Sequence, residues 1–137
     1  MNNLPIEVGN AGALDTSDTG WIIGYSPWCA SGPHNLRLNP PGQTARGPFV
    51  KWYAHPAGHP NGEAKPVSVG RTVALLVGPG GRFRLDFSAT PDFAEGHTIT
   101  HTLQQIGDYV AWGEGVYHRS FGLAPSTILT LRWEPQP

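Results

Sequence analysis

Residues 107–118 read GDYVAWGEGVYH, and the expected fold follows from this stretch. Residues 108–112 have the composition of a β-strand, because a valine and two aromatic side chains fall within five positions. Gly113 and Gly115 then predict a tight turn, and Tyr117 begins the next strand. His118 follows at the start of that strand. In a small all-β protein we expect its imidazole on the inner wall, facing a pocket.

The rest of the chain repeats this pattern of short strands and turns. No window of a dozen residues carries the apolar stripe of a helix, whereas segments with two-residue periodicity recur. The expected strands are residues 21–25, 49–54, 72–77, 82–87, 97–104, 108–112, 117–121 and 127–133. Their spacing is typical of a β-sandwich or small β-barrel. We predict one all-β domain over residues 20–133, with an N-terminal arm at 1–19 and a frayed tail at 134–137.

The composition argues against several classes of function. Of the 137 residues only 14% are charged and the formal net charge is −1, so no basic face is expected for nucleic acid or a membrane surface. The longest apolar run, residues 73–77, is too short to span a bilayer. The N-terminus lacks the pattern of a secretory signal, and the single Cys29 excludes an internal disulfide. We expect a cytoplasmic protein.

The glycines and the histidine of the first stretch also have a recognisable spacing. Gly107, five residues, Gly113, one residue, Gly115, two residues and His118 resemble the second conserved motif of the cupins, with Gly113 in place of a proline. Three further segments match in order, namely residues 20–24, residues 50–52 with 55–58, and residues 82–87. Together they resemble small single-domain bacterial cupins of unassigned function. The resemblance implies a jelly-roll β-barrel with an interior pocket, and a homodimer.

The resemblance fails at the first cupin motif. Metal-binding cupins carry two histidines as His-any-His and then a glutamate there, and these three join the second-motif histidine around one metal. Counting back from Gly78, those positions hold residues 65–67 (Lys-Pro-Val) and Arg71. Three of the four usual ligands are therefore absent, and one histidine does not hold a divalent metal.

A rebuilt metal site is one alternative. His101 shares one face of its predicted strand with His97, and if that face turns inward it could join His118 to bind Zn, Fe, Ni or Mn. His55 and His59, with Glu63 beyond them, have a similar ligand spacing. Because these residues lie among prolines and glycines, they are more simply explained as surface loop residues.

A metal-free pocket is the other alternative. Arg71, if it points inward, could bind a carboxylate or phosphate with its planar guanidinium, while His118 acts as a general base or hydrogen-bond donor. The simpler reading of Arg71 is a solvated turn residue. Trp52, Trp112 and Tyr109 are candidates for the pocket wall, although core packing would equally explain each of them.

Two functions are compatible with these residues. The first is an enzyme, a cupin isomerase, lyase or oxygenase that acts on a polar organic molecule with His118 as acid, base or metal ligand. The second is a metal-free, non-catalytic module that binds or senses a small carboxylate or sugar-like ligand. A structural homodimer with a vestigial pocket is a third reading. Nucleophilic catalysis by Cys29 has no support, because only His34 lies nearby in the sequence.

Overall fold

Residues 4–25, 36–39 and 42–136 are described by a computed structural model. The strands are β1 (Ile6–Asn10), β2 (Gly24–Tyr25), β3 (Leu38–Asn39), β4 (Thr44–His55), β5 (Arg71–Leu76), β6 (Arg82–Ser88), β7 (Thr98–Leu103), β8 (Asp108–Trp112), β9 (Tyr117–Ala124) and β10 (Ser126–Gln136). One helical turn, η1 (Ala11–Ala13), is a 3-10 helix. Within these ranges there is no α-helix and no helix able to cross a membrane. The prediction of an all-β chain is confirmed, and Cys29 and His34 lie outside the described residues.

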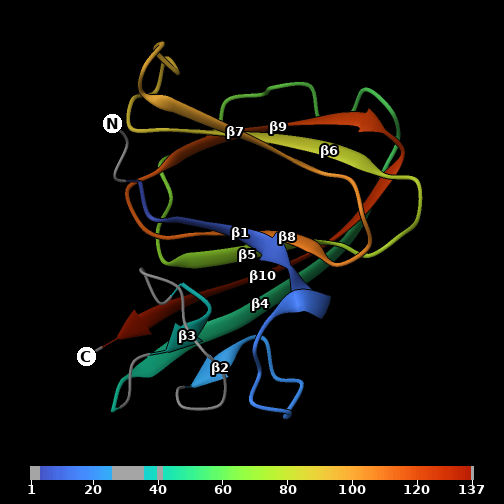
Figure 1. Cartoon of the computed structure of the whole chain (residues 1–137). Coiled ribbons are helices and arrows are strands. Elements are labelled where there is room, and N and C mark those ends of the chain that lie inside the picture. The colour runs from blue at the N-terminus through green and yellow to red at the C-terminus, as the bar shows by residue number, and fades with distance from the viewer. Residues whose placement is uncertain (1–3, 26–35, 40–41, 137) are drawn as a thin grey trace.

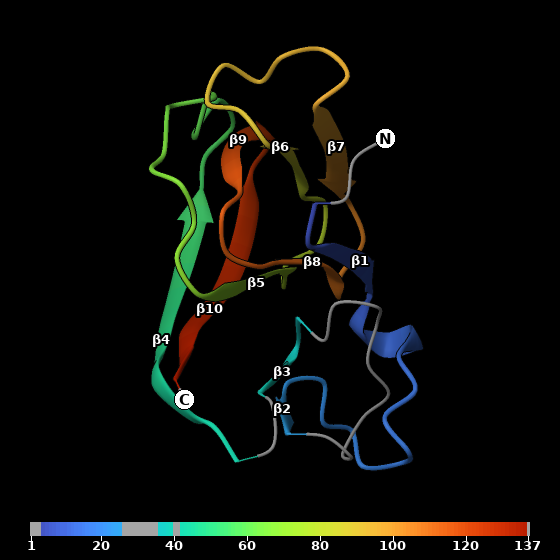
Figure 2. The same ribbon diagram turned by 90° about the vertical axis from the view of Figure 1, so that its left-hand side faces the viewer.

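Two antiparallel sheets face one another (Figure 1). One sheet has five strands in the order β1-β8-β5-β10-β4, and the other has three strands in the order β7-β6-β9. A short parallel pair, β2 and β3, lies on the outer side of the five-stranded sheet. Strand β4 ends one sheet and β9 ends the other, so the two sheets are not closed into a barrel. The segment of residues 56–70, which joins β4 to β5, runs along this side (Figure 2).

The five-stranded sheet is covered on both faces. Toward the three-stranded sheet, Ala74 and Leu76 of β5 belong to the main hydrophobic core. On the opposite face, Val73 and Leu75 pack in a second cluster with Leu36 and other residues of the N-terminal third of the chain. This explains why β5 is apolar at successive positions, and it confirms the prediction that this strand lies in the interior of its sheet, between β10 and β8.

Strand β6 places the three-stranded sheet on the core. Phe83, Leu85 and Phe87 alternate along it and are buried between the sheets, as predicted. On the other side of the strand lies Asp86, also fully buried because neighbouring side chains cover it. Phe87 pairs with His118 in the register of β6 and β9, so the histidine faces the same interior.

Both ends of the described chain extend the five-stranded sheet. Residues 6–10, expected in an arm, form β1 and pair with β8. Residues 134–136, expected to fray, continue β10 past a bulge and pair with residues 44–46 of β4. The tail forms a ladder because β4 offers it unpaired backbone groups along a free edge. The sequence pattern could not show this edge, because it depends on a pairing of segments far apart in the chain.

Candidate functional site

A cavity of about 700 Å³ lies between the two sheets. Its size falls in the range of small-molecule sites. The inner wall is buried and mainly apolar, and its apolar residues are Ala74, Phe83, Leu85, Trp112 and Ile128. The mouth lies between β4 and residues 63–69, where most of the lining residues are exposed. The cavity thus has a buried floor and a solvent-exposed entrance.

His118 is a polar group of the inner wall, together with the smaller Thr72 and Ser120. Its ring lies 4.9 Å from the Trp112 ring and 6.4 Å from the Phe87 ring, measured between centroids. Its Nδ1 atom is buried and has no hydrogen-bond partner among the described residues. Burial, followed by the positive charges of Lys65, Lys51 and Arg132, lowers the pKa of His118 to about 4. The imidazole is therefore neutral at pH 7.

Residues 56–70 form one side of the cavity because their backbone is tied to β9. The Gly122 N–H donates to the Pro60 carbonyl at 2.9 Å, and the Gly58 N–H donates to the Gly122 carbonyl at 2.7 Å. A Cβ atom at position 122 would lie 2.3 Å from the carbonyl oxygen of His59. Glycine is therefore needed at position 122 for the segment to approach β9 this closely.

Ser68 fastens the other end of this segment. Its hydroxyl donates to the Gly113 carbonyl at 2.6 Å and accepts from the Val116 N–H at 2.9 Å. Residues 65–67, at the position of the missing His-any-His pair, are thereby held at the cavity and line it. The chain thus presents a lysine to the space where the cupin resemblance implies histidine ligands.

Two further histidines stand at the mouth. The Nδ1 atoms of His55 and His59 are 3.2 Å apart, and both rings stack on Tyr53 with centroid distances of 4.0 and 5.5 Å. Burial, followed by the charges of His59 and Lys51, lowers the pKa of His55 to about 4. Sequence reasoning favoured surface loop positions for this pair. Because His55 has the same parity on β4 as Tyr53, the strand in fact turns it toward the cavity.

Trp112 also lines the cavity, whereas Tyr109 and Trp52 face away from it. On β8, Val110 and Trp112 point inward, so Tyr109 points outward, where its hydroxyl donates to Glu7 at 2.6 Å. Trp52 is likewise on the outward side of β4 and is 66% exposed. Both residues were chosen for their aromatic type, but the alternation of side chains along the strand decides their direction.

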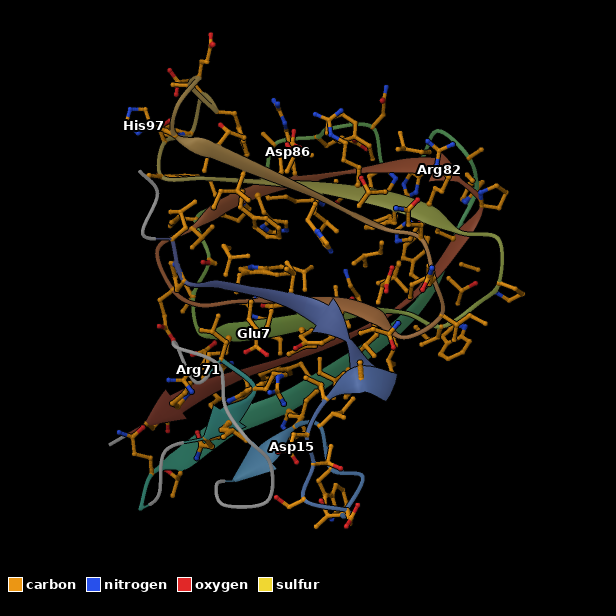
Figure 3. The ribbon with its side chains drawn as sticks, viewed as in Figure 1. Glu7, Asp15, Arg71, Arg82, Asp86 and His97 are labelled. Carbon is orange, nitrogen blue, oxygen red and sulfur yellow. The ribbon has the colours of Figure 1, made fainter. Side chains whose placement is uncertain are left out.

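Arg71 is also outside the cavity. It is the first residue of β5 and points to the outer face, where its guanidinium donates to the Leu38 carbonyl (Figure 3). The expectation of an inward anion-binding arginine is therefore wrong for this position. The cations that do line the cavity are Lys51, Lys65 and Arg132, which the sequence reasoning did not select. For Lys51 the sequence did contain a signal. It lies two residues before Tyr53 on β4 and therefore on the same face of the strand.

His101 does not join His118. It lies on β7, which β6 separates from β9, so the two backbones are at least about 10 Å apart. Among the described residues, no group of three or more histidine, cysteine, aspartate or glutamate side chains could hold a metal ion. The lysines and the arginine around His118 also disfavour a cation there. The residues present do not fit the cupin metal.

Comparisons with known proteins add little to this geometry. No protein-family model and no curated protein matches the sequence. Among solved structures, HEPD of Streptomyces albus, with its substrate 2-hydroxyethylphosphonate and Fe(II) bound, is similar at 14% sequence identity with a TM-score of 0.47. The match covers 61% of this chain and 17% of that one. At this level the likeness supports no conclusion about the activity of the chain.

Proposed function

We propose that this chain is a cupin-like jelly roll, open at β4, that processes a polar organic molecule in its interior cavity without a metal. One observation carries the proposal. The neutral imidazole of His118 stands on the wall of a cavity of about 700 Å³ with a buried, unpartnered Nδ1. A buried polar atom without a partner is costly, and a ligand that hydrogen-bonds to it would remove that cost.

A neutral imidazole can take part in proton transfer. One ring nitrogen accepts a proton from a hydroxyl or an activated C–H bond of the bound molecule, and the resulting imidazolium returns it to another atom. Such a step fits isomerisation or elimination. The Trp112 ring, 4.9 Å from the imidazole between centroids, covers part of it and excludes water there.

A metal-free binding or sensing module is the second candidate, and a separate observation favours it. Catalytic histidines usually have a carboxylate that orients the ring. Among the described residues none is hydrogen-bonded to Nδ1 of His118, and the charges that act on its ring are those of Lys65, Lys51 and Arg132. In this case the same imidazole would only recognise the ligand by hydrogen bonding.

The test combines binding and exchange. A thermal-shift screen with hydroxy acids, amino acids, sugar acids and nucleotides should find ligands that stabilise the wild type and not His118→Ala. His97→Ala, at an exposed position just before β7, is the matched control. The ligands are then followed by proton NMR in D₂O. Deuterium incorporation that His118→Ala abolishes supports the enzyme, and binding without exchange supports the module. Equal binding by His118→Ala would overturn both.

A further inference from the structure

The cavity concentrates positive charge in a chain whose formal net charge is −1. Of the described residues that line it, Lys51, Lys65 and Arg132 are cationic, and Glu63 is acidic. The carboxylate of Glu63 is turned to its own loop, where its Oε2 atom accepts the Asn61 N–H at 2.5 Å. The cavity is thus a region of net positive charge in a protein whose formal net charge is slightly negative.

The three cations surround one space. Lys51 pairs with Thr130, and Arg132 pairs with Phe49, so the two cations are diagonal neighbours on the inward face of β4 and β10. Side chains in this relation are about 7 Å apart at Cβ, within reach of a shared ligand. Lys65 comes from the opposite side of the mouth, on the segment that Ser68 holds in place. A group at the mouth would therefore be contacted from two sides.

None of these cations forms an ion pair within the described part of the chain, although Glu63 lies close enough to Lys65 for their charges to interact. The ion pairs there involve Arg37, Arg46, Arg84 and Arg119. Arg46 is informative because it lies on β4, as Lys51 does, and forms an ion pair at 3.0 Å with Glu134 of β10. The two strands therefore form an ion pair outside the cavity, whereas their cations at the cavity, Lys51 and Arg132, form none among the described residues. Like charges held together repel, and a bound anion relieves that repulsion.

We infer that the cavity binds an organic anion, with a carboxylate or phosphate group between Lys51, Lys65 and Arg132 and an apolar body against the wall formed by Trp112, Leu85 and Ile128. The inference rests on the proposed function and narrows its ligand class. It also explains how His118 is used. The neutral ring adds no fourth positive charge. Burial is the main cause of the low pKa of His118, and the negative charge of the ligand would oppose the smaller contribution of the lysines to it.

Isothermal titration calorimetry with simple probes tests the inference. Benzoate and phenyl phosphate represent the two anions, and benzyl alcohol and benzamide are their neutral counterparts. We expect both anions to bind at least about 10-fold more tightly than the neutral probes, with an affinity that falls as salt is added. The difference between benzoate and phenyl phosphate then distinguishes a carboxylate site from a phosphate site.

Variants connect the affinity to the residues. The double variant Lys51→Gln, Lys65→Gln should lose about 10-fold or more in anion affinity and leave the neutral probes unchanged. Arg46→Gln, which removes a cation of the same strand outside the cavity, is the control and should bind as the wild type does. Circular dichroism checks that each variant is folded.

The outcomes separate the inference from the function on which it rests. Neutral probes that bind as tightly as the anions, or a double variant with unchanged anion affinity, would overturn the anion site while leaving the His118 pocket intact. Failure of both anions to bind up to about 10 mM would also overturn it. Loss of the proposed function is recognised differently, by ligand binding that persists in His118→Ala.

Discussion

On the outer face of the three-stranded sheet, Arg84 and Arg119 share the carboxylate of Asp86, whereas Lys51 and Lys65 at the cavity mouth have no acidic partner among the described residues. Arg84 donates from Nε to Oδ1 and from Nη2 to Oδ2 of Asp86, both at 3.0 Å. Arg119 donates from Nε to the same Oδ2 at 2.8 Å. Figure 3 shows Asp86 on this outer face.

The two regions differ in what completes them. In the outer cluster of Arg84, Asp86 and Arg119, both guanidinium groups bind one buried carboxylate, so the cluster keeps a net charge of +1. The guanidinium groups also lie over the rings of Phe121 and Phe93 at 4.6 and 4.3 Å. Each of its cations therefore has a counterion supplied by the fold itself. The cavity has three cations and one carboxylate, Glu63, and none of the three cations forms an ion pair among the described residues. This is the arrangement of a region that an external anion would complete.

The largest expected effect comes from breaking the outer cluster. Asp86→Ala removes a fully buried carboxylate and leaves two arginines side by side. Because those arginines are about one-third exposed, solvent screens part of the penalty, and we expect a loss of about 2–4 kcal/mol in the free energy of unfolding. Urea denaturation measures it. Glu134→Ala, which breaks the exposed pair with Arg46, should cost less than about 1 kcal/mol. Equal losses in the two variants would contradict the proposed role of Asp86.

The next effect concerns the wall that carries Lys65. In Gly122→Ala the new methyl group would lie 2.3 Å from the His59 carbonyl, so residues 56–62 must move away from β9. We expect a loss of about 1–3 kcal/mol and changed amide chemical shifts along this segment. Gly78→Ala is the control, since its nearest neighbour would be Thr127 Cβ at 3.5 Å. If Gly122→Ala left both stability and shifts unchanged, the segment would not be fixed to β9 as described.

Much of this architecture follows from local pattern, and the rest does not. The alternation of β6 and the turn before β9 are local, and from them Phe87 and His118 could be placed on the interior face. Tyr109 was misplaced because its aromatic type was given more weight than its position. It lies three residues before Trp112 and therefore on the opposite face of β8. Lys65 lies on a segment without periodicity, so its direction depends on contacts of Ser68 with a turn 45 residues away.

The pairing of the two longest strands is also nonlocal. Strand β4 extends well beyond the predicted residues 49–54 because it pairs along its whole length with β10, including the last described residues of the chain. That pairing brings Lys51 and Arg132 together at the cavity. No local pattern contains this information, since the register of two strands is set by the packing of both.

A third prediction separates the two regions by pH. The lowered pKa values of His118 and His55, about 4 against 6.5 when unfolded, mean that the unfolded chain binds more protons between these values. Stability is therefore complete above pH 6.5 and is lost as the pH falls toward 4. Burial raises the pKa of Asp86, but the hydrogen bonds from Arg84 and Arg119 outweigh this effect and lower the pKa. Asp86 therefore stays ionised in this window.

The measurement is the urea midpoint between pH 7 and pH 4.5. After allowance for partial exposure, we expect His118 to account for about 1 kcal/mol of the loss, so His118→Gln should show a shallower decline than the wild type. His97→Gln is the matched control. A decline in His118→Gln as steep as that of the wild type would show that the buried imidazole is not responsible for it.

The smallest effect tests the charge of the cavity through His118 itself. Burial is the main reason for its low pKa, and Lys65 and Lys51 add to it. Replacing both lysines by glutamine should therefore raise the pKa of His118 by less than about one unit, with the greater part of the lowering retained. The Cε1–H resonance of the imidazole, followed against pH, reports this directly. Arg46→Gln should leave it unchanged, because Arg46 is neutralised by Glu134. A pKa that did not rise in the lysine variant would mean that the two lysines lie too far from the ring to polarise a ligand there, and the inferred anion would then have to be held by Arg132 alone.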